Sequence, residues 1–302
     1  MGKKKIKRAL RYFCARLLLR VALVIVYFTP LFLFRRLCIL LSRIFFGVSR
    51  YYQGLAFSNL RIVFPKRTDE ERKRILLRSS VFSGMNVAHT FWFLAHSRKR
   101  RNLVVLKNPG ILDTALNYQC GVIGITAHIG AFTILGGVLA EYGYKVNYIL
   151  RTPRDEKMKG LLEKGLRMQG VKPIFTKPMV DCVEKAISVL RNNEILIILI
   201  DREVGNSGVF VRFFGHYTSA PAGPVIFSLR TGARIIPMFM LRENQRESLL
   251  FYPEFKIIYR DNLEKTIFEN TQNLISFLEE IIEKYPEQWS WIDRRWRVAM
   301  DR

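Results

Sequence analysis

The stretch that decides the fold is Gly121–Val146, which reads GVIGITAHIGAFTILGGVLAEYGYKV. Its first part, Gly121–Ala127, is short, apolar and contains β-branched residues, which predicts a buried central strand. A tight junction follows at residues 128–130, and Gly130 allows the chain to turn there at little steric cost. The small and apolar residues after it predict a helix that ends near Gly143.

His128 follows directly after this predicted strand. In open α/β sheets, ligands bind in the crevice outside the carboxyl ends of the strands. We therefore take the His128 imidazole as the candidate reacting group. The residues alone leave a second reading equally open, in which His128 is a buried histidine that fills the end of a strand.

Strands and helices alternate along most of the chain. Strands are predicted at Leu103–Leu106, Val146–Leu150, Lys172–Ile174, Ile195–Ile200, Val209–Phe214, Ala233–Leu241 and Leu249–Tyr259, the last interrupted by Pro253. Helices are predicted at Asp113–Tyr118, Asp155–Gln169, Asp181–Arg191, Gly223–Gly232 and Leu263–Lys284. This alternation predicts an α/β fold with a mostly parallel central sheet flanked by helices. Asp201 ends the strand ILIILI just as His128 ends its own strand, so the two side chains are expected to share one site.

The composition is both basic and apolar. The chain has 302 residues, a formal net charge of +24 and 49% hydrophobic residues. Such a charge indicates a polyanionic partner, and the apolar content favours an anionic membrane surface. Nucleic acid is excluded as the partner because Lys and Arg are spread along the chain and no nucleic-acid-binding motif is present. The four cysteines are scattered without metal-ligand spacing, so no metal or other cofactor is expected.

The N-terminus is predicted to anchor the protein to a membrane. Residues 1–16 carry seven Lys or Arg and no acid, and the apolar segment Leu17–Phe34 follows, interrupted by Arg20. A bilayer-spanning helix needs about 20 apolar residues, so the segment fits either a spanning helix kinked at Pro30 or an interfacial amphipathic helix. A signal peptide is the other reading, but no small-residue cleavage site follows. We expect an anchoring segment over residues 1–47, with the basic cluster in the cytoplasm.

The remaining residues, 48–302, are predicted to form one domain that begins with helices. Thr68 is a plausible helix N-cap, and Asn86–Leu94 is an apolar helical stretch in which His89 is predicted to be a satisfied core histidine. The C-terminal stretch Pro286–Trp296, PEQWSWIDRRW, is predicted to pack against the domain and to anchor it at the membrane interface.

Four stretches together resemble one protein family. HIGAFTILGGVLAEYGYKV (128–146) resembles the "HFGNWELLG…L…GY.V" segment of the bacterial lipid A late acyltransferases, which belong to the lysophospholipid-acyltransferase-like superfamily. NLRIVFPKRTDEERKRILLRS (59–79) is similar to their "NL…FP…" helices, and residues 208–239 to their "G.FV.FFG….T..GP..LA..TGA…P" block. PEQWSWIDRRW is similar to their "PEQW.W.HRRW" ending. The resemblance runs from about residue 15 to residue 297 in the expected order.

The resemblance implies a glycerolphosphate-acyltransferase-like fold and a membrane-bound enzyme. Such an enzyme moves a fatty acyl chain from an acyl carrier protein, or from acyl-CoA, to a hydroxyl of a phosphorylated glycolipid. The usual acceptor is a lipid A precursor, and relatives acylate phosphatidylinositol mannosides. The implied location is the bacterial inner membrane, with the catalytic domain facing the cytoplasm.

The family signature His-x4-Asp/Glu is only half present. His128 matches the general base, but the acid position is occupied by Thr133, which carries no charge. Asp201, Glu203 and Glu141 are the candidate substitutes, and Asp201 is favoured because it ends a neighbouring strand. The other reading of Thr133 is a divergent relative that binds lipid with weak or no activity.

Basic residues at the same sheet edge are candidates for substrate binding. Arg151 ends the strand Val146–Leu150 and resembles the arginine of the family's "Y.VYR" segment, where it contacts an acceptor phosphate or carbonyl. A surface ion pair with Asp155 or Glu156 is the equally plausible alternative. The further binding candidates are Arg154, Arg202, Arg212, Gly130 at the turn, and Gly223, which opens a helix and presents backbone N–H groups to an anion.

Overall fold

The computed structural model describes residues 14, 17, 21, 23–96 and 103–296. Within these ranges a seven-stranded sheet has the order β1-β9-β8-β2-β5-β3-β4. The strands are β1 (Val104–Lys107), β2 (Val122–Thr126), β3 (Val146–Leu150), β4 (Val171–Phe175), β5 (Ile195–Leu199), β8 (Arg234–Glu243) and β9 (Arg246–Phe251). All neighbours pair in parallel except β8 and β9. The predicted α/β fold with a mostly parallel sheet is therefore confirmed.

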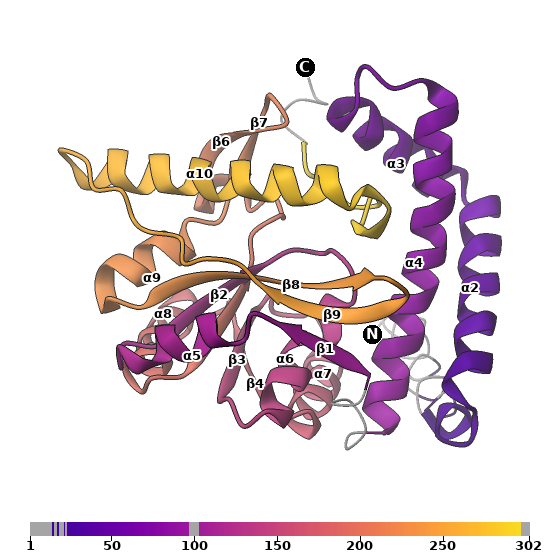
Figure 1. The fold of residues 1–302 in the computed structure, drawn as a ribbon, viewed down its shortest axis with the longest axis horizontal. Coiled ribbons are helices and arrows are strands. Elements are labelled where there is room, and N and C mark those ends of the chain that lie inside the picture. Colours follow the sequence, from indigo (N-terminus) through magenta and orange to yellow (C-terminus); the bar gives the residue numbers. More distant parts are fainter. Residues whose placement is uncertain (1–13, 15–16, 18–20, 22, 97–102, 297–302) are drawn as a thin grey trace, which may run out of the picture.

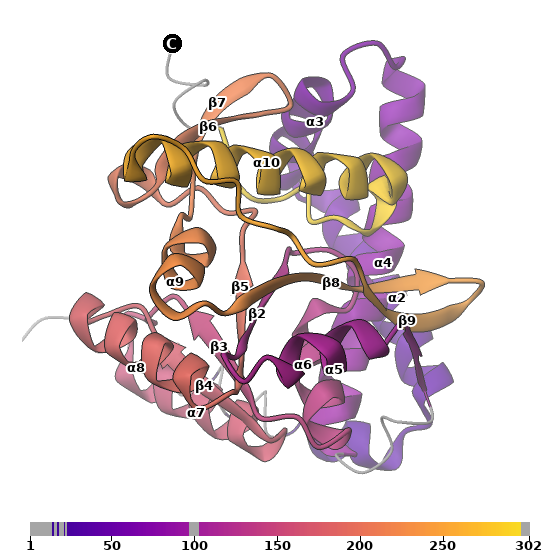
Figure 2. The same ribbon diagram turned by 60° about the vertical axis from the view of Figure 1, so that its left-hand side comes forward.

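Helices cover both faces of this sheet (Figures 1 and 2). They are α2 (Leu31–Val48), α3 (Arg50–Val63), α4 (Asp69–Ala95), α5 (Gly110–Asn117), α6 (Phe132–Glu141), α7 (Glu156–Met168), α8 (Met179–Arg191), α9 (Gly223–Thr231) and α10 (Leu263–Lys284). Successive residues of β5 alternate between two apolar clusters, with Leu196 packed among α8, α9 and α10 and Ile197 packed among α4, α5 and α6. This period of two follows from the strand geometry, and it places β2 and β5 at the centre of the core.

The helices α2 and α4 stand side by side along one side of the molecule, and α3 lies above them (Figure 1). Their backbones approach closely, because a Cβ added to Gly84 would lie 2.6 Å from the Cα of Ile39. Thr68 is the N-cap of α4 as predicted. Its hydroxyl accepts the N–H of Glu71, and the Glu71 carboxylate accepts the N–H of Thr68.

The anchor predicted over residues 1–47 falls partly outside the described residues, which omit 1–13, 15–16, 18–20 and 22 and therefore most of the basic cluster. Residues 23–28 are helical, the helix is interrupted at Thr29–Pro30, and α2 begins at Leu31. No helix among the described residues combines the length and the apolar character needed to cross a bilayer. The division of the chain at residue 47 stays a prediction.

Two antiparallel hairpins differ from the sequence prediction. The predicted strand Val209–Phe214 is present as β6 (Val209–Phe213), but it pairs with β7 (His216–Ala220), a strand that was not predicted, in a separate two-stranded sheet. β8 continues to Glu243 and returns as β9, which begins three residues earlier than predicted and ends before Pro253. Proline has no N–H to offer to a strand ladder, and the predicted interruption at Pro253 agrees with this end. Beyond it the chain does not resume the strand to Tyr259 and makes only an isolated bridge between Phe255 and Ile235.

Candidate active site

The register of β2 and β5 brings His128 and Asp201 together. Thr126 of β2 lies opposite Leu199 of β5, and each chain then runs two residues further to its polar side chain. His128 Nδ1 lies 2.7 Å from Asp201 Oδ1, and the His128 backbone N–H donates to Asp201 Oδ2 at 3.1 Å. The sequence prediction that these two residues meet is consistent with this geometry.

Asp201 accepts hydrogen bonds from other residues besides His128. Its Oδ2 also accepts the indole N–H of Trp289 at 3.0 Å and Nη2 of Arg295 at 3.0 Å. Burial alone would raise the pKa of Asp201. The charges of His128 and Arg295, with the hydrogen bonds from His128 and Trp289, outweigh burial and lower this pKa well below its ordinary value. Asp201 is therefore a carboxylate in a fully buried position.

The ionised carboxylate fixes the state of the imidazole. A carboxylate only accepts hydrogen bonds, so His128 Nδ1 must carry the proton that it shares with Asp201. In the neutral ring Nε2 is then the unprotonated nitrogen. The His128 side chain is 14% exposed while that of Asp201 is not exposed at all, so the imidazole is the accessible member of the pair. The arrangement can accept a proton from a group that approaches Nε2.

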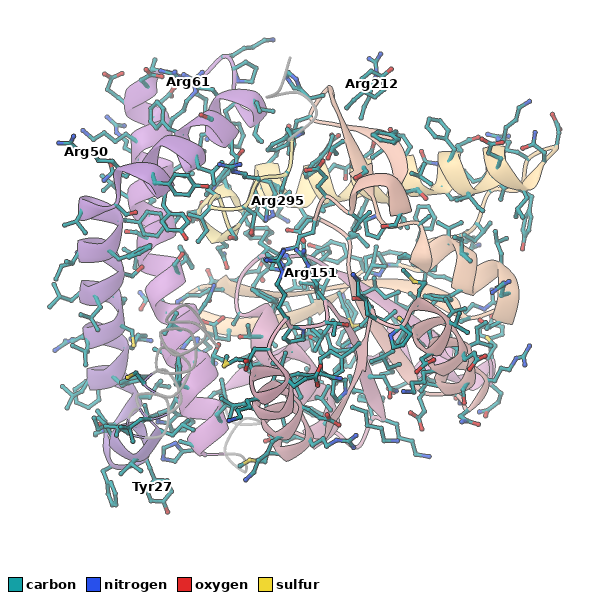
Figure 3. The ribbon with its side chains drawn as sticks, turned by 180° about the vertical axis from the view of Figure 1, so that it is seen from behind. Tyr27, Arg50, Arg61, Arg151, Arg212 and Arg295 are labelled. Atoms are coloured by element: carbon teal, nitrogen blue, oxygen red, sulfur yellow. The ribbon has the colours of Figure 1, made fainter. Side chains whose placement is uncertain are left out.

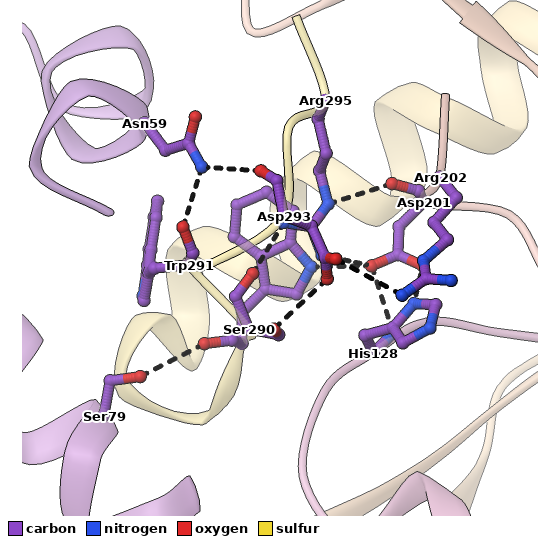
Figure 4. Close-up of polar contacts among 10 residues, drawn as sticks. Asn59, Ser79, His128, Asp201, Arg202, Ser290, Trp291, Asp293 and Arg295 are labelled. Carbon is purple, nitrogen blue, oxygen red and sulfur yellow. Dashed lines mark hydrogen bonds and ion pairs between the residues drawn. The ribbon is translucent and has the colours of Figure 1, made fainter. Parts of the chain in front are cut away.

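The C-terminal segment Pro286–Trp296 crosses directly over this pair (Figure 4). The Gly130 N–H donates to the Gln288 carbonyl at 2.9 Å, and the Ser290 N–H donates to the His128 carbonyl at 3.0 Å. The side chains of Trp289, Trp291 and Trp296 are all buried. The prediction that this segment packs against the domain agrees with their burial. The prediction that it also anchors the domain at a membrane interface is wrong for these three tryptophans, because their side chains lie in the core.

Trp289 and Arg295 are the site residues that sequence reasoning missed. They lie 88 and 94 residues after Asp201 in the chain. The dense PEQWSWIDRRW motif was a signal that this segment mattered, but no local pattern connects a tail to a distant strand end.

Thr133 does not take the place of the missing acid. It lies in the first turn of α6, and its hydroxyl is 2.6 Å from the hydroxyl of Thr90 on α4. Thr90 in turn donates to the Asn86 carbonyl at 2.7 Å, so Thr133 is the donor between the two hydroxyls. The hydrogen bonds of the described residues do not join Thr133 to His128.

The two other candidate carboxylates lie elsewhere. Glu141 is the last residue of α6, at the end of the helix that is distant from the His128 junction. Glu203 follows Asp201 by two residues. It lines a small pocket, whose other lining residues include Asp201, Thr218, Ser219 and Arg295. Of the three candidates, Asp201 is the one with a described hydrogen bond to the His128 ring.

The basic residues that were predicted to bind substrate at this sheet edge are only partly brought together. Arg151 and Arg154 are exposed and follow the end of β3, and Figure 3 shows Arg151 extending toward the centre of the molecule. No ion pair joins Arg151 to another described residue. Of its two predicted partners, Asp155 caps α7 and Glu156 pairs with Lys159. The alternative of a surface salt bridge is therefore not realised.

Arg202 and Arg212 are engaged in other contacts. Arg202 Nη2 lies 3.2 Å from Asp293 Oδ1 of the C-terminal segment. Arg212 lies on β6 at the top of the molecule, well away from Arg151 in Figure 3, and its guanidinium stacks over Tyr217 at 5.1 Å. Arg212 is therefore not brought to the edge that holds His128.

The two candidate glycines have different structural roles. Gly130 has a φ of +54°, and a Cβ added there would lie 1.8 Å from the Met240 carbonyl oxygen. Only glycine fits this turn, which holds the His128 junction against β8. Gly223 is the first residue of α9 and is followed by Pro224, which has no N–H. The described hydrogen bonds do not connect Gly223 with His128.

His89 is buried as predicted, but it is not a satisfied core histidine. Its Nδ1 has no hydrogen-bond partner among the described residues and lies 3.5 Å from Glu247 Oε1. Burial, followed by the charges of Arg242 and Arg35, lowers the pKa of His89 to about 4. His89 is therefore neutral at pH 7, and its contact with Glu247 is not an ion pair.

Comparison with known proteins decides the family. A family model described as bacterial lipid A biosynthesis acyltransferase matches residues 1–298. The chain belongs to this family. It is thus an acyltransferase, as the sequence resemblance implied.

Individual relatives agree with this assignment. The lipid A biosynthesis palmitoleoyltransferase of Escherichia coli K12 is 24% identical over 252 residues, covering 82% of this chain and 79% of its own. The lipid A biosynthesis lauroyltransferase of the same organism is 21% identical, covering 80% and 77%. The phosphatidylinositol mannoside acyltransferase of Mycolicibacterium smegmatis is 30% identical over 107 residues, a match that spans only 35% of this chain and 34% of that relative.

Among solved structures, the 1-acyl-sn-glycerophosphate acyltransferase PlsC from Thermotoga maritima aligns with a TM-score of 0.37 and 13% identity. The alignment covers 82% of this chain and 99% of that one.

Proposed function

We propose that this acyltransferase moves a fatty acyl chain from a thioester donor to a hydroxyl of a lipid A precursor or related phosphorylated glycolipid, with His128 as the general base. The observation that carries the proposal is the bond between His128 Nδ1 and the buried Asp201 carboxylate at the carboxyl ends of β2 and β5. The family membership supports the reaction class, and the named relatives that act on lipid A support the acceptor class.

The proposed chemistry uses the free nitrogen of His128 twice. The acceptor hydroxyl donates its proton to Nε2 while its oxygen attacks the thioester carbonyl carbon, which forms the new C–O bond. The tetrahedral intermediate then collapses, the C–S bond breaks, and the imidazolium returns the proton to the departing thiolate. General base catalysis of this kind contributes about 10²- to 10⁴-fold in rate. Asp201 stabilises the imidazolium and holds the ring in the required tautomer.

Arg151 is the proposed contact for the acceptor phosphate. It is exposed, it follows β3 at the same sheet edge, and it has no ion-pair partner among the described residues. A guanidinium can bind a phosphate through two parallel hydrogen bonds. Arg154 is the neighbouring cation in the same loop, and the backbone at Gly223 remains a proposed anion or oxyanion contact.

The donor is proposed to be an acyl carrier protein, with acyl-CoA as the alternative. The net charge of +24 favours an acidic carrier protein, and it equally favours an anionic membrane. The exposed apolar side chains of α2 support an interfacial position, and the proposal places the catalytic domain at the cytoplasmic face of the bacterial inner membrane.

The competing reading, an inactive lipid-binding relative, rested on Thr133. The carboxylate that Thr133 cannot supply has a counterpart in Asp201, which reaches the imidazole from the neighbouring strand. This contact is the reason to prefer the active enzyme.

The experiment measures transfer of a labelled acyl chain to a lipid A precursor, using wild type, His128→Ala and His216→Ala. His216 is an exposed histidine on β7 and serves as the matched control. We expect the His128 variant to lose at least about a hundredfold in rate while the His216 variant keeps wild-type rate. Parallel reactions with acyl carrier protein and acyl-CoA thioesters identify the donor. Full activity of the His128 variant would refute the proposed base.

A further inference from the structure

Arg295 is buried beside the proposed catalytic pair without touching the histidine. Its side chain is 1% exposed, which is rare for an arginine. Its Nε donates to the Asp201 backbone carbonyl at 2.9 Å and its Nη2 donates to Asp201 Oδ2 at 3.0 Å. One planar guanidinium thus donates hydrogen bonds to both the backbone carbonyl and the carboxylate of the same aspartate (Figure 4).

The guanidinium is itself held rigidly in place. Its Nη1 donates to the Ser290 carbonyl at 2.6 Å, and its plane lies over the Trp289 ring, 4.0 Å from the centroid. The Trp289 indole donates to the same carboxylate oxygen as Arg295 does. Arg295 and Trp289 therefore act on Asp201 as one unit supplied by the C-terminal segment.

We propose that Arg295, supported by Trp289, is a positioning residue that keeps the Asp201 carboxylate fixed on Nδ1 of His128, so that the tail of the chain sets the orientation and the tautomer of the imidazole. The inference rests on the function proposed above, in which His128 is the base. It assigns a chemical role to a tail segment for which the sequence predicted only packing and anchoring.

The physical reason is the burial of the aspartate. A carboxylate withdrawn from water needs opposite charge and hydrogen bonds to remain ionised. Arg295 supplies a permanent charge, so the carboxylate stays ionised whether the imidazole is neutral or protonated. The ionisable or charged groups described around the pair are Arg202, Glu203, Asp293 and Arg295.

Charge and geometry can be separated by two substitutions at Arg295. Arg295→Met removes both, and Arg295→Lys keeps the charge but cannot make the two bonds to Asp201 in one plane. For Arg295→Met we expect kcat to fall about 10- to 100-fold with little change in the acceptor KM. For Arg295→Lys, which keeps the charge, we expect a kcat between those of wild type and Arg295→Met, again with little change in the acceptor KM.

The matched control is Arg72→Met. Arg72 is also buried, donates to the carbonyls of Phe64 and Pro65 and pairs with Asp69, but it lies at the start of α4. We expect this variant to lose thermal stability while it keeps the wild-type kcat per folded molecule. Trp289→Phe keeps the packing and removes one N–H donor, and we expect it to lower kcat about three- to tenfold.

The outcomes separate the two proposals. If His128→Ala is inactive and Arg295→Met keeps the wild-type kcat per folded molecule, the positioning role is wrong and the proposed base stands. If His128→Ala is fully active, both fail. Should Arg295→Met not fold, Arg295→Lys and Trp289→Phe decide, and wild-type kcat in both would overturn the inference.

Discussion

A single carboxylate determines what the His128 ring can do. Asp201 accepts from Nδ1, and this leaves Nε2 unprotonated in the neutral ring. In Asp201→Asn, the side-chain amide can donate to Nδ1 and so favours the tautomer with the proton on Nε2. We expect the acyl transfer rate to fall by about 10²- to 10⁴-fold, measured at saturating donor and acceptor. Glu203→Gln is the matched control, and a larger loss there than at Asp201 would assign the partner to Glu203.

His89 makes stability depend on pH. Its pKa is lowered from 6.5 to about 4 in the folded protein, so between these values the unfolded chain binds more protons. The free energy of unfolding is then unaffected above pH 6.5 and falls as the pH drops to 4, by up to about 3 kcal/mol. We expect denaturant titrations to show this loss in wild type and to show less of it in His89→Gln.

The comparison between the two proteins isolates His89. Burial raises the pKa of Glu247, which acts in the opposite direction, but Glu247 is present in both proteins. His216→Gln removes an exposed histidine and should leave the wild-type profile unchanged. Identical profiles for wild type and His89→Gln would show that the buried ring is protonated as readily as a free one.

At the scale of elements, the junction between β2 and α6 depends on one glycine. Gly130 and Gly143 both have positive φ, but only at Gly130 would a Cβ meet a backbone atom, the Met240 carbonyl oxygen at 1.8 Å. We expect Gly143→Ala to cost about 1 kcal/mol of stability and to keep activity. Gly130→Ala should cost more and should reduce the transfer rate at least about tenfold, because the chain that carries His128 must move. Thermal unfolding and kcat are measured on both variants, and equal effects would contradict this account.

The elements that sequence reasoning placed correctly are those with strong periodicity or clear ends. β3 and α10 have the predicted bounds, because Val146–Leu150 is a short apolar run and Leu263–Lys284 has a regular apolar face. The hairpins were missed because only one residue of each two-residue turn, Gly215 or Asn244, is typical of such turns. The other residue, Phe214 or Gln245, also has positive φ, a conformation that single-sequence patterns do not assign to phenylalanine or glutamine.

The part of the site that lies at strand ends could be predicted from the sequence, whereas the part supplied by the C-terminal segment could not. His128 and Asp201 each follow an apolar strand directly, so the rule for strand ends was enough to bring them together. Arg295 and Trp289 reach Asp201 through tertiary packing of a segment far along the chain. Arg212 was correctly predicted to lie on a strand, but this strand belongs to the separate two-stranded sheet β6-β7 and not to the central sheet, so Arg212 does not reach the edge that holds His128.

At the scale of the whole molecule, apolar and basic side chains are exposed together on α2. The exposed apolar residues of this helix are Phe32, Leu33, Leu37, Leu40, Leu41, Ile44, Phe45 and Val48. Arg36 and Arg43 are exposed on the same helix, and the opposite side packs on α4 through Phe34 and Cys38. A helix of this kind suits the interface of an anionic bilayer, where its apolar side chains leave water and its arginines meet phosphate groups.

Binding to vesicles tests whether α2 has this role. Leu40 and Leu41 are each 55% exposed. The double substitution Leu40→Glu/Leu41→Glu should weaken binding to phosphatidylglycerol-containing vesicles at least about tenfold, because two leucines that insert into the bilayer are replaced by negative charges. Leu263→Glu is the control, since Leu263 is 65% exposed at the start of α10, on the opposite side of the molecule from α2 in Figure 1. Salt should weaken binding of wild type and control alike, because their basic residues are unchanged. Equal binding by all three proteins in a flotation assay would mean that another surface meets the membrane.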